Sequence, residues 1–405
     1  MLRRLFNTCL AMALAVAALG ASPAHAQMSG KYFTILIVTD MSSIYAGNSG
    51  PGTVAAVKMA IKDFGGTVNG VPIRLLVLDN KLNPTLTLNK TRQLIQQDHV
   101  NLITDVTSSA AAIEVAKLAS EYKVTTTFVS PGSTVLTNSM CSRYTWHYAW
   151  DTYALAEIAG GAITKLGAKR WYFIAADYAY GHDLYNQFKK AVTDAGGTVT
   201  GVSFAPFPNS DFSTYLLKAK STRPDAIGLL ESGQDVVNAM KQAREFGLAG
   251  KVRLVPGQIN LSDVRDAGVE AYQGVTAADI WYWNMDPRAR AWADRFKAVT
   301  GYRPGSLHAA NYSAVTQILD TVKRIGTDNP DKIADALEGH SFDDMFARHA
   351  TWRAKDHSVI HDLILEAVKK PDQIKIPEDY FKVIRIVPGK DAFMPLSENT
   401  CKHDW

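Results

Sequence analysis

The sequence has none of the common catalytic signatures. It contains no His-Glu-x-x-His pair, no Gly-x-Ser-x-Gly turn and no Gly-x-x-x-x-Gly-Lys-Ser/Thr phosphate loop. These absences disfavour the metallohydrolases, serine hydrolases and nucleotide-dependent enzymes that carry such motifs. We therefore expect a protein that is not an enzyme and holds no cofactor.

Clusters of like charge are also missing. The chain has 43 Lys and Arg against 39 Asp and Glu, a formal net charge of +4, and the basic residues are spread along its length. Nucleic acids and membrane surfaces are bound by concentrated basic groups. Neither is an expected partner.

Long apolar runs are absent except near the start. An Arg-Arg pair at positions 3 and 4 precedes an apolar run at residues 10–19, and Ala24-His25-Ala26 supplies small residues before a cleavage point. This is the pattern of a secretory signal peptide, and the run is shorter than the roughly 20 residues of a membrane span. We expect a signal peptide over residues 1–26, cleaved after Ala26, and a soluble protein exported to the periplasm. An uncleaved anchor is the alternative.

Cysteine is scarce, with only three in the chain. Cys9 falls in the predicted signal peptide, which leaves Cys141 and Cys401. In an oxidising compartment an isolated pair is most simply a disulfide, which would restrain the C-terminal tail. Two free buried thiols are the alternative that the sequence leaves open.

What the chain does contain is a regular alternation of β-rich and amphipathic runs. Strands are predicted at 33–39, 73–78, 101–106 and 125–129, with helices at 51–64, 86–97 and 109–122 between them. Apolar strands separated by helices are typical of a parallel sheet with right-handed crossovers.

The alternation breaks at residues 131–150, which are rich in aromatic side chains, and then resumes. Helices are predicted at 152–166, 182–195, 212–221 and 234–246, and strands at 171–175, 198–204, 226–230 and 252–255. The segment from 274 onward, with helices near 288–299 and 306–325 and strands at 350–352, 360–368 and 381–387, is expected to complete the two sheets.

The length also favours more than one hydrophobic core. The prediction is an α/β fold of two doubly wound parallel-sheet lobes.

Polar and aromatic residues follow the predicted strands. Doubly wound sheets bind ligands at the carboxyl ends of their strands, where hydroxyls and helix N-termini suit a small carboxylate and tyrosines supply flat walls. Taken singly, each serine is equally well a helix cap and each tyrosine a core residue; their recurrence at successive strand ends favours a site. The candidate ligand-binding residues are Tyr45, Ser108, Ser109, Ser133, Thr134, Tyr153, Tyr178, Tyr180 and Gln258.

Two other patterns do not indicate a site. Residues 50–55 (Gly-Pro-Gly-Thr-Val-Ala) match the dinucleotide fingerprint, but a loop at 41–49 separates them from the strand, so we interpret them as a helix start. Four late histidines could suggest a metal, but His357 and His361 flank a strand-like run and lie too far apart to share an ion. We expect no metal site, and surface positions for His340, His349, His357 and His361.

Four segments together resemble a known family. They are residues 39–46 (Thr-Asp-Met-Ser-Ser-Ile-Tyr-Ala), 129–134 (Val-Ser-Pro-Gly-Ser-Thr), 176–181 (Ala-Asp-Tyr-Ala-Tyr-Gly) and 211–213 (Asp-Phe-Ser). Their order resembles the branched-chain amino-acid-binding type of periplasmic solute receptor. The resemblance implies the type I periplasmic-binding fold, in which two lobes are joined by three crossovers. Lobe one would comprise residues 27–148 and 277–347, and lobe two residues 149–276 and 348–405, including the C-terminal tail. The resemblance also implies closure of the two lobes on a small-molecule ligand and delivery to an inner-membrane ABC permease with cytoplasmic ATPase subunits. We expect a monomer.

The resemblance also implies roles for single residues. Ser108 or Ser109, and Ser133 with Thr134, match positions that hold the ligand carboxylate, and Tyr178 or Tyr180 matches a wall residue. Amino-acid receptors place a glutamate after the Pro of the strand near 255, but this chain reads Pro-Gly-Gln at 256–258. A buried ligand ammonium would lack its counter-charge, which disfavours amino acids unless Glu231 or Asp279 reaches the ligand.

Residues 150–156 (Trp-Asp-Thr-Tyr-Ala-Leu-Ala), 282–283 (Tyr-Trp) and 388–393 (Pro-Gly-Lys-Asp-Ala-Phe), with Cys401, are similar to one subgroup of that family. The subgroup is associated with aromatic carboxylates such as benzoate and phenylpropenoid acids. An aromatic carboxylate is therefore the expected ligand. Other small acids, amino acids, amides and short peptides remain alternatives, as does ligand sensing for a membrane signalling protein.

Overall fold

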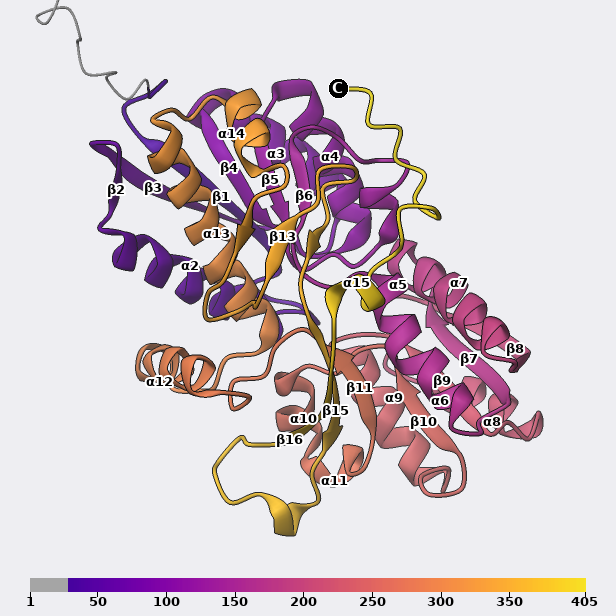
Figure 1. Cartoon of the computed structure of the whole chain (residues 1–405). Helices are drawn as coiled ribbons and strands as arrows, with labels where there is room; N and C mark the ends of the chain where they lie inside the picture. Colours follow the sequence, from indigo (N-terminus) through magenta and orange to yellow (C-terminus); the bar gives the residue numbers. More distant parts are fainter. Residues whose placement is uncertain (1–27) are drawn as a thin grey trace, which may run out of the picture.

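The first of two large sheets lies in the N-terminal part of the computed structural model, which describes residues 28–405 (Figure 1). The predicted signal peptide lies outside the described residues. The strand order is β2-β3-β1-β4-β5-β6, and all neighbours except β2 and β3 pair in parallel. The strands are β1 (Phe33–Thr39), β2 (Thr67–Val68), β3 (Val71–Asp79), β4 (Val100–Asp105), β5 (Thr125–Phe128) and β6 (Thr145–His147).

The second sheet has four parallel strands in the order β10-β9-β7-β8. Its strands coincide closely with the predicted ones: β7 (Arg170–Ala176), β8 (Thr198–Ala205), β9 (Ala226–Leu230) and β10 (Arg253–Pro256). The predicted fold class, with two doubly wound lobes, is confirmed. We call the first sheet with its helices lobe one and the second sheet with its helices lobe two.

Helices cover both sheets. In lobe one, α13 packs against α2, so a late segment of the chain returns to the first lobe (Figure 1). The helices of lobe one are α2 (Gly50–Phe64), α3 (Pro84–Asp98), α4 (Ser109–Tyr122), α12 (Pro287–Thr300), α13 (Ser306–Ile325) and α14 (Pro330–Leu337). Those of lobe two are α7 (Ala179–Asp194), α8 (Ser213–Ser221), α9 (Gln234–Glu245), α10 (Leu261–Ala267) and α11 (Val269–Tyr272).

The predicted helix over 152–166 is present and links the two lobes. It consists of α5 (Thr152–Leu155), a π-helical turn, η2 (Ala156–Gly161), and α6 (Ala162–Lys165). A Cβ added at Gly160 would lie 2.9 Å from Cδ1 of Phe188 on α7, so glycine is needed for this close approach. The linking helix therefore packs tightly on lobe two.

The expectation that the C-terminal strands complete the two main sheets is wrong. They form two separate three-stranded antiparallel sheets. No crossover helix separates β15 from β16, and a direct connection of this kind gives antiparallel pairing. One small sheet is β11 (Thr276–Asp279), β15 (Leu363–Val368) and β16 (Phe381–Val387), and the other is β12 (Ser341–Phe342), β13 (Ala350–Trp352) and β14 (Val359–Ile360).

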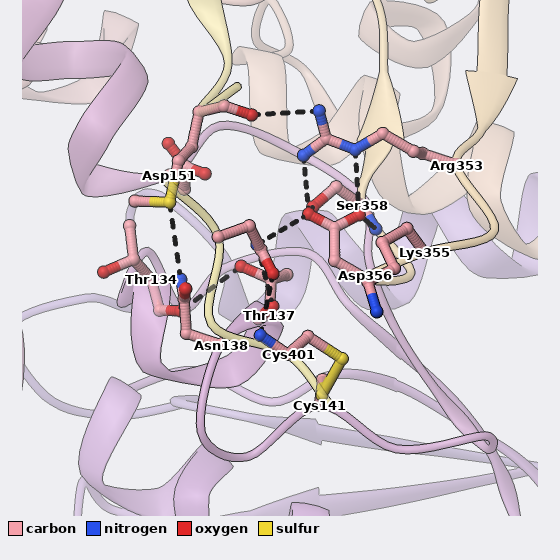
Figure 2. A network of polar contacts seen from close by, with 12 residues as sticks. Thr134, Thr137, Asn138, Cys141, Asp151, Arg353, Lys355, Asp356, Ser358 and Cys401 are labelled. Atoms are coloured by element: carbon pink, nitrogen blue, oxygen red, sulfur yellow. Dashed lines mark hydrogen bonds and ion pairs between the residues drawn. A yellow bond between two sulfur atoms is a disulfide. The ribbon is translucent and has the colours of Figure 1, made fainter. Parts of the chain in front are cut away.

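The C-terminal tail, residues 393–405, returns to lobe one beyond the short helix α15 (Gly389–Ala392). The predicted disulfide between Cys141 and Cys401 is present, with Cα atoms 5.8 Å apart. Beside it, the backbone N–H of Thr400 donates to Asn138 Oδ1 at 2.8 Å. Figure 2 shows this region together with Arg353, whose guanidinium holds the carboxylate of Asp356.

The placement of two late histidines corrects a prediction. His357 and His361 are 1% and 2% exposed rather than on the surface. The ring of His357 stacks on Trp146 with centroids 3.6 Å apart, and His361 packs against Phe346 and Phe393. Burial lowers the pKa of His357 to about 4, so the ring is neutral. Both histidines belong to the packing between the small sheets and lobe one.

Candidate functional site

A cavity lies between the two lobes. It has a volume of about 360 Å³ including its opening. Its walls come from loops that follow β1, β4, β5 and β6 on one side and β7, β9 and β10 on the other, which are the carboxyl ends of parallel strands. The lining residues are Tyr45, Asn48, Ser49, Thr107, Ser108, Ser109, Ser130, Pro131, Gly132, Trp150, Tyr178, Tyr180, Ser232, Gln258 and Leu307.

Most of the candidate residues meet at this cavity. The six that line it are Tyr45, Ser108, Ser109, Tyr178, Tyr180 and Gln258. Sequence reasoning missed Thr107, Ser130 and Ser232, which stand in the same strand-end loops, and also Trp150. The aromatic run at 144–150 was the available signal for Trp150.

Ser133, Thr134 and Tyr153 do not line the cavity. The Ser133 hydroxyl accepts from the backbone N–H of Val135 and caps a 3-10 turn, η1 (Thr134–Thr137). The backbone N–H and hydroxyl of Thr134 both donate to the carboxylate of Asp183 on α7, at 2.8 and 3.0 Å. The two hydroxyls predicted to hold a carboxylate are thus engaged elsewhere, Thr134 in a contact between the lobes.

The loop between β4 and α4 has an unusual backbone. Asp105, Val106 and Ser108 have φ values of 73°, 58° and 86°. The left-handed region is unfavourable for residues with a Cβ, and for a β-branched one such as Val106 it is a clear outlier. The side-chain amide of Asn80 donates to the Thr107 carbonyl at 2.7 Å and helps to hold the loop. Strain of this kind, concentrated beside a cavity, is typical of functional sites.

Asp105 organises the hydroxyls around this loop. Its buried carboxyl accepts from Ser130 Oγ, from Thr107 Oγ1 at 3.2 Å and from Asn311 Nδ2 at 3.1 Å. Burial raises the pKa of Asp105. Because Ser130 donates to Asp105, its hydroxyl can only accept a hydrogen bond from the cavity.

The N-terminus of α4 lines the cavity with two hydroxyls that are free to donate. Ser108 precedes the helix, but its side chain makes no capping bond. Ser109 Oγ accepts from the backbone N–H of Ser133 at 3.3 Å, so its own hydrogen is free to donate. The first N–H groups of a helix lack partners within the helix and carry a partial positive charge. This end of the cavity can bind an anion.

Aromatic side chains from both lobes meet at the cavity. The hydroxyls of Tyr45 and Tyr178 are hydrogen-bonded across the lobes, and Phe207 stacks on Tyr178 with centroids 4.1 Å apart. The backbone N–H of Gln234 donates to the carbonyl of Ile44 at 3.2 Å. Burial raises the pKa of both tyrosines, so their hydroxyls stay protonated. The lobes are therefore in contact around the cavity.

None of the described residues that line the cavity is charged. Glu231 and Asp279 are buried but outside the lining. Burial raises the pKa of Asp279 to about 7, and the pKa of Glu231 lies well above its ordinary value because of burial and the neighbouring Asp235. Gln258 stands near the position where the family resemblance predicts the glutamate of amino-acid receptors. Its side-chain amide donates to Asn260 Oδ1 at 3.3 Å.

Within residues 28–405, no three His, Cys, Asp or Glu side chains are grouped so as to hold a metal ion. Over the same residues, no helix is both long and apolar enough to cross a membrane.

The chain is similar to known periplasmic proteins. Residues 33–372 match the sequence family described as periplasmic binding protein. The crystal structure of a periplasmic binding protein from Burkholderia mallei has 39% sequence identity and a TM-score of 0.90, over 93% of this chain and 100% of that one.

The names of two more distant relatives state which ligands those proteins bind. The leucine-, isoleucine-, valine-, threonine- and alanine-binding protein of Pseudomonas aeruginosa is 26% identical over 40% of this chain, and the match spans less than half, 44%, of that relative's length. A solute-binding protein of an ABC transporter from Rhodopseudomonas palustris BisB5, in complex with 3,4-dihydroxy benzoic acid, has 23% identity and a TM-score of 0.81 over 89% of this chain and 99% of that one. The latter likeness is one of fold.

Proposed function

Because this chain belongs to the periplasmic binding protein family, we propose that it is the substrate-binding protein of an ABC importer for a small organic acid, most specifically an aromatic carboxylate. It is exported to the periplasm, closes its two lobes on the acid and delivers it to an inner-membrane permease.

The observation that carries the proposal is the N-terminus of α4. It presents Ser108 and Ser109 to a cavity that has no charged lining residue among those described. Helix N-termini with free N–H groups and hydroxyls bind carboxylates well without a basic side chain. The ligand carboxylate would lie here.

The rest of the cavity suits a flat, apolar body. Tyr45, Trp150, Tyr178 and Tyr180 supply aromatic surface to the cavity. Sites for small molecules are lined mostly by apolar and aromatic side chains with a few polar groups. The same fold holds an aromatic acid in the complex from Rhodopseudomonas palustris. These features favour a small aromatic acid over a peptide.

Ligand capture follows from the position of the cavity. Lobe one binds the carboxylate first, and lobe two then closes with Tyr178, Tyr180 and Gln258 over the remainder. A ligand that contacts both lobes favours the closed arrangement, because only that arrangement provides all its contacts. The hydrogen bond between Tyr45 and Tyr178 then joins the two lobes beside the ligand.

Amino acids are the second candidate, favoured by the name of the Pseudomonas aeruginosa relative. Their ammonium group would need a buried counter-charge. Glu231 and Asp279 lie outside the cavity lining, and the strand end at Pro256 is followed by Gly257 and Gln258. This lack of an acid at the ligand is the reason to prefer an acid without an amino group.

A thermal-shift screen of the ligand-stripped protein tests the proposal. Matched sets of benzoates, aliphatic acids, amino acids and amides are compared. A ligand at 100 times its Kd should add about 2.7 kcal/mol to the free energy of unfolding. We expect stabilisation of this size from the benzoates. Stabilisation by amino acids alone would overturn the proposed ligand class.

A further inference from the structure

Two buried hydrogen-bond donors at the cavity have no partner. The indole Nε1 of Trp150 and the hydroxyl of Tyr180 find no hydrogen-bonding atom among residues 28–405, although both side chains are only 3% exposed. Both residues line the cavity. Buried polar groups without a partner are rare in folded proteins, and each one calls for an explanation.

The two side chains are brought together from different parts of the fold. Trp150 follows β6 at the crossover between the lobes, whereas Tyr180 lies in the first turn of α7 in lobe two. Their ring centroids are 6.2 Å apart in an edge-to-face arrangement. The two donors therefore belong to one place in the cavity.

Packing holds this pair in position. A Cβ added at Gly132 would lie 2.1 Å from Cζ3 of Trp150, so the indole rests directly on the backbone of the loop after β5. A Cβ at Gly181 would lie 2.0 Å from the carbonyl oxygen of Ala176, which fixes the start of α7 against the end of β7. Rigid donors need no reorganisation when a ligand arrives.

The chemistry of the donors limits what they can bind. An indole N–H only donates, so the ligand group that meets Trp150 must be an acceptor and is neither an ammonium nor a methyl group. The described lining contains no Lys or Arg to balance a second negative charge.

We propose that Trp150 and Tyr180 form an oxygen-acceptor subsite, which selects acids that carry a second, uncharged oxygen in addition to the carboxylate. A hydroxyl, ether or carbonyl oxygen on the ring meets this requirement. The inference rests on the proposed function, because it assumes that the carboxylate is held at the N-terminus of α4.

Calorimetric titration with matched benzoates tests the subsite. The probes are benzoate and the ortho, meta and para isomers of hydroxybenzoate, methoxybenzoate and methylbenzoate. We expect at least one oxygen-bearing isomer to bind about tenfold more tightly than the methyl compound of the same position, the worth of one strong hydrogen bond. Tyr180→Phe and Trp150→Phe should each reduce this ratio to within about twofold of one.

The ratio of the two affinities within a matched pair distinguishes a lost hydrogen bond from a packing defect. A packing defect weakens the binding of both members of the pair, so the ratio does not change. Tyr185→Phe, on the same helix but outside the cavity lining, is the control and should keep the wild-type ratio. Firm binding of benzoates with equal affinities within each pair, or ratios unchanged in both variants, overturns the subsite but leaves the proposed function standing. Binding of amino acids with none of the benzoates overturns both.

Discussion

The hydroxyl of Tyr45 in lobe one lies 2.7 Å from the hydroxyl of Tyr178 in lobe two. Each tyrosine also contacts Phe207, with ring centroids 5.8 and 4.1 Å away. The three rings come from loops that follow β1, β7 and β8. Their contact joins the two lobes beside the cavity, which Tyr45 and Tyr178 line.

Tyr45→Phe removes this hydrogen bond and keeps the ring. A neutral hydrogen bond contributes about 0.5–1.5 kcal/mol, so we expect a bound benzoate to dissociate about two- to tenfold faster. Stopped-flow displacement measures the rate. The change should leave the association rate nearly unaltered, and an unchanged dissociation rate would show that the tyrosine pair does not hold the lobes closed.

Ser108→Ala combined with Ser109→Ala removes both hydroxyls at the N-terminus of α4. Hydrogen bonds to charged groups contribute about 1.5–3 kcal/mol, so we expect affinity for the acid to fall at least about tenfold. Isothermal titration calorimetry measures the loss.

Ser133→Ala is the matched control for that variant. Its hydroxyl caps η1 and does not face the cavity, so the change should lower the free energy of unfolding by about 1 kcal/mol and leave the Kd within about twofold. An equal loss of affinity in this control would show that Ser133 does help to bind the ligand carboxylate.

His308 makes stability depend on pH. Burial lowers its pKa from 6.5 to about 4. Below pH 6.5 the imidazole of His308 is protonated in the unfolded chain but stays neutral in the folded chain. Its contribution to stability is therefore complete above pH 6.5 and declines as the pH falls towards 4. From pH 7 to 5 the decline should be about 2 kcal/mol.

His308→Gln isolates this effect from the other buried groups. The difference in free energy of unfolding between wild type and variant, measured by urea denaturation at pH 7 and pH 5, should shift in favour of the variant at the lower pH. A difference that is independent of pH would mean that His308 binds a proton equally well in both states.

Reduction of the bond between Cys141 and Cys401 should release the tail before it unfolds the protein. The bond lies four residues before the last described residue. The other contacts of the tail are hydrogen bonds such as those of Asn399 and Thr400, and the packing of Phe393 on His361 and of Trp405 on His357. We expect hydrogen exchange over residues 393–405 to rise on adding reductant while the strands of lobe one keep their protection. The Cys401→Ser variant should behave like the reduced protein, and full protection of its tail would contradict this.

The sequence was sufficient to predict the two large sheets. Buried parallel strands appear as continuous apolar runs, and the helices between them appear as apolar residues at helical spacing. It failed for β15 and β16, where the same apolar runs recur without a helix between them. Pairing there depends on the connection rather than on the strands. The burial of His357 was equally hidden, because its partner Trp146 is distant in the chain.

The candidate site was predicted in position more than in detail. The rule that ligands bind beyond strand ends identified the loops that contribute Ser108, Tyr178 and Gln258. It could not tell which side chain of a loop turns to the cavity, as Ser133 and Thr134 show. For Thr134 the orientation depends on Asp183 of α7, whose carboxylate accepts hydrogen bonds from the backbone N–H and the hydroxyl of Thr134.

The return of the tail to lobe one matters for building a sensor from this protein. Ser29 is hydrogen-bonded to Asp328 and Trp405 to Glu338, so both ends of the described chain are attached to the same lobe. A pair of fluorophores at these two ends would keep its separation while the lobes open and close. An optical reporter of ligand needs one of its dyes on lobe two, for example at the exposed Ser221, the last residue of α8.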